Sequence, residues 1–342
     1  MMKYAPIIIP TLCRYEHFVR LIESLRRNTW AKYTDIYVGV DYPPSEKYKD
    51  GYKKICEYLE GDFLEFASFH VFKHKENLGS FANSAFLRGI IFQKYDRFIR
   101  TDDDAEFSPN FIEYIDKCLM EYEKDPDVIA VTGYSYPIDW QVSKGASILK
   151  ENFICPMWGI GFWKDKYIQI KQDIDDGCLK DSIPFVIKNS LRKQMLTTCE
   201  CEYTDLCLSP IFKDTLAAKM TDIATRMYMV IHDKYVIVPI VSKVRNWGFD
   251  GSGEYCANIT TIKGSYNASN YPYNEQPIDE SEDFDIIPDV LNQININRNL
   301  LDSFEAVSWK RLLKVRLKML LYRILGKKIF NAIMGYNKIL SS

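Results

Sequence analysis

Several features that would assign the chain to a common class are missing from its 342 residues. No run of 18 or more apolar residues occurs, which excludes a membrane-spanning helix. No GxGxxG follows the first predicted strand, so the usual dinucleotide fingerprint is absent. The net charge is only −2, which gives no reason to expect a nucleic-acid partner. The nine cysteines form no CxxC pair and no signal peptide precedes the first strand, which indicates a cytoplasmic protein.

Apolar runs alternate with segments of helical period along the first half of the chain. Strands are expected at 6–10, 35–40, 66–72 and 98–99, and helices at 15–28, 46–59 and 80–93. Further strands are expected at 128–132 and 235–241, with 134–157 irregular. This alternation predicts an α/β fold, a Rossmann-like and mostly parallel sheet flanked by helices.

The most informative stretch is the acid triplet Asp102, Asp103 and Asp104, which follows the short β-prone run 98–99. In open α/β sheets, ligands bind at the carboxyl ends of the strands. Three adjacent carboxylates repel each other by roughly 1 kcal/mol per close pair in water, so they require a cation. A hard divalent ion that also binds substrate phosphates meets this need. An acidic loop that only breaks the strand is the alternative.

Two later segments combine glycine with aromatic residues. The segment 155–163 reads CPMWGIGFW, where glycine lets a backbone approach a ligand and tryptophan offers a flat face to a sugar. Protein cores use the same residues, which is the alternative. The segment 245–253 reads RNWGFDGSG and has the composition of a flexible loop.

The end of the chain differs from the rest in charge. Between Trp309 and Lys328 there are eight lysines and arginines and no acid. An apolar stripe repeats at helical spacing on the same segment, at Leu313, Leu317, Leu320 and Ile324. Such a basic amphipathic helix is typical of binding to an anionic membrane surface. A helix packed on the domain with a solvated face is the alternative.

In their order and spacing, these motifs resemble nucleotide-sugar glycosyltransferases of the GT-A fold. More narrowly, the sequence is similar to the inverting N-acetylglucosaminyltransferase that initiates complex N-glycans and to related bacterial glycosyltransferases. The resemblance covers roughly residues 5 to 255 and includes a Pro-x-Phe-x-x-Tyr segment that follows the acid triplet, at 109–114.

The resemblance implies roles for individual residues. Arg14 would contact the nucleotide diphosphate and Asp41 the uracil ring. The nucleotide-sugar site as a whole would consist of Thr11, Arg14, Asp41, Asn77, Asp102 and Asp103. Asp104 would be the direct ligand of Mn²⁺ or Mg²⁺, with Asp102 beside it as the second acid of the metal site.

The second half would hold the acceptor and close over the donor. The acceptor-side segment corresponds to Trp158, Gly159, Gly161 and Trp163, and the donor-closing loop to Arg245, Asn246 and Gly248. Counting back from Pro239 to the family's catalytic base gives Asp222. The tryptophans that flank the base in the family are absent here, so Asp205 and Glu202 remain alternatives.

Together these features predict a GT-A domain over 1–263, with a nucleotide-sugar half at about 1–133 and an acceptor half at about 134–263. A polar and acidic linker (264–304) and a membrane-associating helix (305–342) would follow. The expected reaction is metal-dependent, inverting transfer of a hexosyl or N-acetylhexosaminyl group from a UDP-sugar to a glycan or lipid-linked acceptor, as in bacterial surface polysaccharide assembly, at the inner face of the membrane. A sugar-nucleotide nucleotidyltransferase and a non-catalytic sugar- or lipid-binding protein on a degenerate scaffold are the alternatives.

Overall fold

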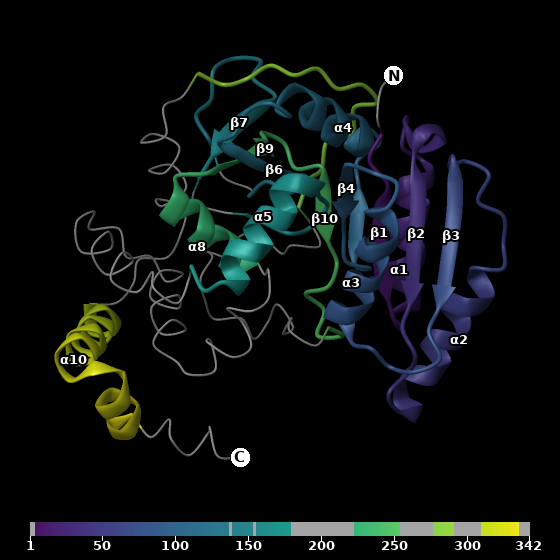
Figure 1. Cartoon of the computed structure of the whole chain (residues 1–342). Coiled ribbons are helices and arrows are strands. Elements are labelled where there is room, and N and C mark those ends of the chain that lie inside the picture. Colours follow the sequence, from purple (N-terminus) through teal and green to yellow (C-terminus); the bar gives the residue numbers. More distant parts are fainter. Residues whose placement is uncertain are drawn as a thin grey trace.

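A single eight-stranded sheet with helices on both faces organises the chain (Figure 1). The computed structural model describes residues 4–136, 139–152, 155–178, 222–253, 276–290 and 309–334. The sheet has the order β3-β2-β1-β4-β8-β6-β9-β7. Its strands are β1 (Ile7–Thr11), β2 (Asp35–Val40), β3 (Ser68–Lys73), β4 (Arg97–Arg100), β6 (Val128–Thr132), β7 (Ile148–Glu151), β8 (Ile160–Trp163) and β9 (Tyr235–Pro239).

Most strands of this sheet point in the same direction. The strands β3, β2, β1 and β4 are parallel to one another. Strand β8 runs antiparallel to both β4 and β6, so β6 has the direction of β4, and β9 is parallel to β6. Only β7 and β8 run the other way. The predicted mostly parallel α/β sheet is therefore confirmed.

The helices are α1 (Tyr15–Arg26), α2 (Lys49–Tyr58), α3 (Ser80–Ile91), α4 (Phe111–Glu121), α5 (Lys164–Asp175), α8 (Asp222–His232) and α10 (Trp309–Ile333), with short 3-10 turns at Ala31–Tyr33 and Glu46–Tyr48. On β8, Gly161 faces Ile115 of α4, whereas the next residue, Phe162, contacts Tyr167 of α5. Because neighbouring residues of a strand point to opposite faces, α4 and α5 cover opposite faces of the sheet.

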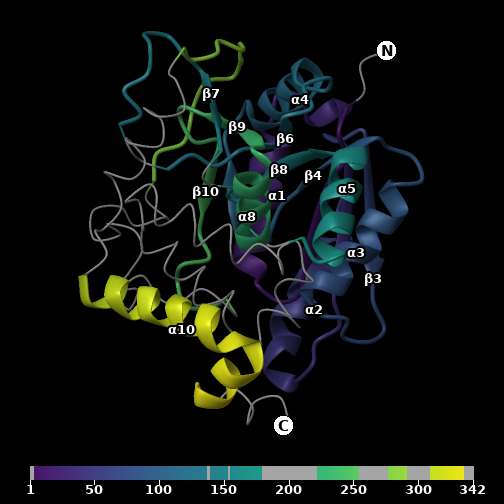
Figure 2. The same cartoon turned by 60° about the vertical axis from the view of Figure 1, so that its left-hand side comes forward.

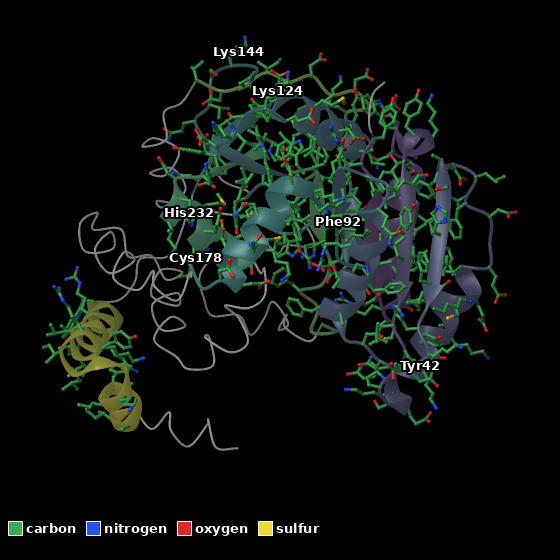
Figure 3. All side chains as sticks on the ribbon, viewed as in Figure 1. Tyr42, Phe92, Lys124, Lys144, Cys178 and His232 are labelled. Atoms are coloured by element: carbon green, nitrogen blue, oxygen red, sulfur yellow. The ribbon has the colours of Figure 1, made fainter. Side chains whose placement is uncertain are left out.

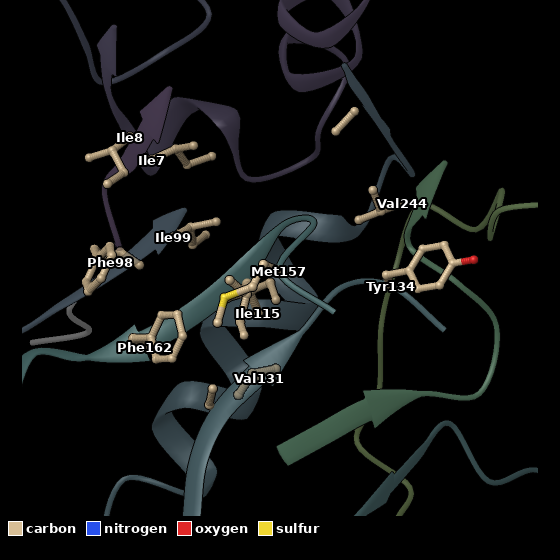
Figure 4. Packing of buried hydrophobic residues seen from close by; sticks show 14 of the residues in the cluster. Ile7, Ile8, Phe98, Ile99, Ile115, Val131, Tyr134, Met157, Phe162 and Val244 are labelled. Carbon is tan, nitrogen blue, oxygen red and sulfur yellow. The ribbon is translucent and has the colours of Figure 1, made fainter. Parts of the chain in front are cut away.

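The core lies between the sheet and these helices. Ile7 and Ile8 of β1, Ile99 of β4 and Val131 of β6 are fully buried, and Ile115 packs over the sheet from α4 (Figure 4). Continuous apolar runs of this kind are what a sheet covered on both faces requires.

Two regions depart from the expectations. Strand β7 forms within 134–157, which was expected to be irregular. It is a strand because it pairs with β9, a segment far away in the sequence, and local pattern does not reveal such a pairing. The segment 276–290, part of the expected linker, lies packed on the domain. Gln276 and Phe284 are buried, and Pro288 bridges to Ile148. We call this segment the strap.

Helix α10 is 25 residues long and changes direction at Gly326, whose φ is 69° (Figure 2). The predicted apolar stripe is exposed along it: Leu317 is 50% exposed and Ile324 is 68% exposed. Within the described ranges, none of the helices is both long and apolar enough to cross a membrane.

Candidate active site

Neighbouring strands bring the acid triplet together with the segment that follows β1. Strands β1 and β4 are parallel partners, with Ile8 opposite Arg100, so both end at the same edge of the sheet. Thr11 is the last residue of β1, and the triplet begins two residues after β4 ends. The same edge holds the carboxyl end of β2, beyond which Tyr42 is labelled in Figure 3.

Asp103 and Asp104 are both buried at this edge, with 6% of their surface exposed. The Thr11 hydroxyl donates a hydrogen bond to Asp103 Oδ2 (2.8 Å). The Arg14 guanidinium also donates to Asp103, and its Nη1 lies 2.8 Å from Asp104 Oδ2. One arginine thus neutralises part of a two-carboxylate cluster, and Thr11, Arg14, Asp103 and Asp104 lie together at this edge.

The charge balance of this cluster is incomplete. Burial, together with the neighbouring charges of Asp102 and Asp103, raises the pKa of Asp104 to about 7, although Arg14 opposes the increase. A buried carboxylate with a raised pKa and a carboxylate neighbour is a site where an additional cation is stabilising.

Asp102 lies on the other side of the triplet. Its Oδ1 accepts a hydrogen bond from Arg100 Nη2 (2.9 Å), and Arg100 Nη1 donates to the carbonyl of Met157 (3.3 Å). About a third of the Asp102 side chain is exposed. The three acids therefore have two different arginine partners, Arg14 on one side and Arg100 on the other.

The predicted donor-closing loop packs directly against Asp104. Strand β10 (Val244–Asn246) pairs antiparallel with β5 (Ala105–Phe107), the strand that follows the triplet. The Trp247 amide donates to the Asp104 carbonyl (2.8 Å). A Cβ atom on Gly248 would lie 2.0 Å from Asp104 Oδ2, so only glycine allows this approach. The Asn246 side chain accepts a hydrogen bond from the Gly248 amide (2.7 Å).

Side chains from α1 and β5 fix the same loop. The indole of Trp247 donates to Glu106 (2.8 Å), which also pairs with Arg245 (3.2 Å). The guanidinium of Arg20 lies 4.0 Å from the centroid of a Trp247 ring, a cation–π contact. Further along, His17 Nε2 lies 2.9 Å from Asp250 Oδ2. From Arg245 to Asp250, the loop is therefore packed against the rest of the domain.

Asp41 is buried, and its carboxylate binds the turn that opens α3. The amides of Leu78 and Gly79 each donate to it at 2.8 Å, and the amide of Tyr42 donates at 2.9 Å. The side chain of Asn77 donates to Asp41 (3.3 Å) and to the carbonyl of Tyr42 (2.7 Å). Both carboxylate oxygens are engaged, so the structure assigns Asp41 the role of positioning this turn at the site.

The predicted acceptor-side residues divide between the site and the core. Trp158 is half-buried and makes edge contacts with Tyr134 and with Phe249 of the closing loop. Gly159 has a φ of 62°, and its carbonyl accepts from the Gly133 amide (2.7 Å). Trp158 and Gly159 lie at the same edge of the sheet as the triplet, because the next residue, Ile160, pairs with Arg100 at the end of β4.

Gly161 and Trp163 were expected in the acceptor site, and the structure places them in the core. A Cβ on Gly161 would lie 2.6 Å from the Ile115 side chain, so this glycine serves helix packing. Trp163 is 2% exposed and pairs with Arg97, at the opposite end of β4 from the acids. The antiparallel direction of β8 separates the two tryptophans.

Asp222 is exposed and begins α8. Only two residues join α8 to β9, so the helix runs back along that strand, and both elements are about 16 Å long. Asp222 therefore lies toward the carboxyl edge of the sheet. Burial raises the pKa of Cys155, and the charge of Asp222 adds to this increase. Cys155 lies three residues before Trp158. The alternatives Glu202 and Asp205 lie outside the described residues.

The side chains at this site can be compared with the ligands that a metal ion requires. No group of three or more His, Cys, Asp or Glu side chains arranged to hold a metal ion occurs in the described part of the chain. Mg²⁺ and similar ions are often bound by one or two carboxylates together with substrate phosphates. Asp104, a buried carboxylate with a raised pKa beside two other acids, fits this second arrangement.

Sequence reasoning missed Arg100 and Arg20. Arg100 ends β4 two residues before Asp102, and this closeness in sequence was a local signal of charge compensation. Arg20 gave no local signal in the sequence, because its contact with Trp247 joins residues far apart in the chain.

No protein-family model matches the chain, and no curated protein matches it by sequence. Among solved structures, it is similar to the mannosyltransferase PcManGT from Pyrobaculum calidifontis in complex with GDP-Man and Mn²⁺, with 14% identity and a TM-score of 0.35 over 48% of this chain and 46% of that one. It is also similar to S. aureus TarS (12% identity, TM-score 0.32, 50% of this chain and 30% of that one) and to TarS 1-349 (13%, 0.34, 50% and 49%). The matches span less than half of each of those chains, and likenesses this low assign no activity.

Proposed function

We propose that the chain is a metal-dependent, inverting glycosyltransferase of the GT-A type that uses a nucleotide-sugar donor, UDP-linked by resemblance. Its transferase domain would span 1–263, and its acceptor would be a hydroxyl of a glycan or of a lipid-linked sugar. The observation that carries the proposal is the convergence of Thr11, Arg14, Asp103 and Asp104 at the carboxyl ends of two adjacent parallel strands. That edge is where α/β sheets bind ligands.

The chemistry of these residues suits a nucleoside diphosphate. Arg14 offers a guanidinium fork that binds phosphate oxygens well. Asp104, with Asp102 as the second acid, would hold Mn²⁺ or Mg²⁺ together with the diphosphate, and this ion would neutralise the charge that develops on the leaving group. The docked loop at Arg245, Asn246 and Gly248 would exclude water from the donor.

The acceptor would lie on the side of Trp158 and Gly159. Asp222, exposed at the start of α8, lies toward the same edge of the sheet. We assign it the role of base, which takes the proton of the acceptor hydroxyl as that oxygen attacks the anomeric carbon from the face opposite the leaving group. A positioned base of this kind contributes roughly 10²–10⁴-fold to the rate.

We place the enzyme at the inner face of a membrane through α10. The exposed leucines of this helix and its surplus of lysine and arginine match an anionic lipid surface in both polarity and charge. A lipid-linked acceptor is too apolar to leave the bilayer, so an enzyme concentrated there would meet it.

The test is turnover of a panel of radiolabelled nucleotide-sugars with Mn²⁺, for the wild type and for Asp222→Asn. We expect one donor to be consumed, and kcat to fall at least about 10²-fold in the variant while donor affinity stays nearly unchanged. Donor synthesis from a sugar phosphate and a nucleoside triphosphate would instead support a nucleotidyltransferase. Full activity of Asp222→Asn would move the base to Asp205 or Glu202.

A further inference from the structure

Arg88 on α3 is a half-buried guanidinium to which the proposed reaction gives no role. Its Nη1 donates a hydrogen bond to the Ser84 hydroxyl (2.7 Å), and its Cζ lies 5.3 Å from the centroid of the Tyr167 ring on α5. Figure 2 shows these two helices side by side. Within the described ranges these contacts hold the side chain, and neither partner carries a negative charge.

A second guanidinium lies nearby. Burial lowers the pKa of Arg88, and the charge of Arg100 adds to this decrease while Tyr167 opposes it. Arg100 itself has a single carboxylate partner in the described chain, Asp102. Among the contacts within the described ranges, Arg88 has no carboxylate partner, and the carboxylate that pairs with Arg100 belongs to the proposed metal and donor site. A partly buried positive charge without a partner is unfavourable, and proteins usually supply one.

The two arginines lie on the face of the sheet that α5 covers. Phe98 and Arg100 are two residues apart on β4 and so point to the same face of the sheet. Phe98 makes a ring contact with Tyr167, so this is the face that α5 covers. Arg14 instead contacts Asp103 and Asp104. An anion bound at Arg88 would therefore be separate from a diphosphate bound at Arg14.

We propose that Arg88 and Arg100 form a second anion-binding subsite, which receives a phosphate or carboxylate group of the acceptor. This inference rests on the proposed function and narrows its acceptor to an anionic one. The guanidinium fork favours planar, two-point contacts with such groups, and the aromatic ring beneath Arg88 holds the fork in place. No covalent step is involved at this subsite.

The test is calorimetric titration of methyl phosphate and, separately, glucuronic acid into the full chain saturated with UDP or GDP and Mn²⁺. We expect one of the two probes to bind, which distinguishes a phosphate from a carboxylate acceptor. Arg88→Gln should weaken that binding at least about tenfold, and Arg88→Lys, which keeps the charge, should weaken it less. Nucleotide affinity should remain within about twofold of the wild type in both variants.

Arg26→Gln is the matched control, because Arg26 ends α1 and pairs with Glu65 outside the site. It should leave the binding of both probes unchanged. Unaltered probe binding in Arg88→Gln would overturn the subsite, as would failure of both probes to bind the wild type. Loss of nucleotide affinity in Arg88→Gln would overturn it as well, by making Arg88 part of the diphosphate site. If no nucleotide binds, the same titrations on the protein alone still test the subsite, so the two proposals fail separately.

Discussion

The backbone of Gly248 lies against the carboxylate of Asp104, so closely that a Cβ there would sit 2.0 Å from Oδ2. The contact joins the loop after β10 to the acid triplet after β4, and the amide of Trp247 holds the two backbones together. Whatever binds Asp104 is therefore bound beneath this loop.

Gly248→Ala should displace the loop and weaken nucleotide binding at least about tenfold. The added methyl would also destabilise the fold by roughly 1–3 kcal/mol, as overpacking does. Nucleotide titration and urea unfolding measure the two effects. Gly89→Ala is the control, because Gly89 is exposed on α3 and a Cβ there meets nothing within 4 Å. It should leave binding intact and stabilise the protein slightly, as helical glycine-to-alanine changes do. Equal binding by both variants would contradict a docked loop.

The strap is held by an ion pair between Lys243 and Asp279, which also accepts a hydrogen bond from Asn110 (3.1 Å). The hydrogen bond from Lys243 helps to lower the pKa of Asp279 to about 2, although burial opposes the shift. Asp279→Ala should destabilise the protein by roughly 3–5 kcal/mol, since it leaves a buried ammonium unpaired. The double variant with Lys243→Met should recover most of that loss. Urea unfolding measures both, and equal stability of the single and double variants would argue against the pair.

The folded-state pKa of Asp279 lies below its unfolded value, so the stabilisation from this pair is present above about pH 4 and is lost as the pH falls toward 2. Asp279→Ala should therefore differ most from the wild type near neutral pH. The difference should shrink on acidification.

Asp116 should show the opposite pH dependence. It is fully buried in α4, accepts a hydrogen bond from the Ala5 amide (2.9 Å), and its Oδ2 has no partner among the described residues. Burial raises its pKa from 3.8 to about 7. The protonated form thus favours the folded state, and this stability is present below about pH 4 and lost as the pH rises to 7.

Asp116→Asn keeps an acceptor for Ala5 and removes the titration. We expect the free energy of unfolding of the variant to gain on that of the wild type between pH 4 and 7, by up to roughly 4 kcal/mol, with no further change above pH 7. Urea unfolding at several pH values measures this. Parallel curves across the range would show that Asp116 is ionised in the folded protein.

Helix α10 should bind vesicles that contain anionic lipid, through exposed leucines beside its basic residues. Replacing Leu317 and Leu320 with glutamate should abolish co-sedimentation, because each change removes apolar contact and adds repulsion. Ile168→Glu, at an exposed apolar position on α5, is the control and should bind as the wild type does. Binding that survives the double change would return α10 to ordinary packing.

Local pattern predicted the first half of the fold well, because each strand there is a short apolar run and each helix has a clear stripe. The expected strand 35–40 coincides with β2, and the triplet meets Arg14 as expected. Neighbouring parallel strands end at the same edge of a sheet. The residues that follow two such strands can therefore be predicted to lie close together from the strand pattern alone.

The errors occurred where composition alone cannot separate core from site. Gly161 is needed for the approach of Ile115, and Trp163 turns away because β8 is antiparallel, which depends on pairing with β4 and β6. The strap was taken for part of a linker because it is acidic, and its buried partner Lys243 lies far away in the sequence. Such contacts are set by tertiary structure.

The most direct test of the central claim is calorimetric titration of the nucleoside diphosphate, with Mn²⁺ and then with excess chelator, for the wild type and for Asp104→Asn. The raised pKa of Asp104 and its place beneath Gly248 predict tight binding only with the metal, and loss of this metal dependence in the variant. Equal affinity of the wild type with metal and with chelator would contradict the account.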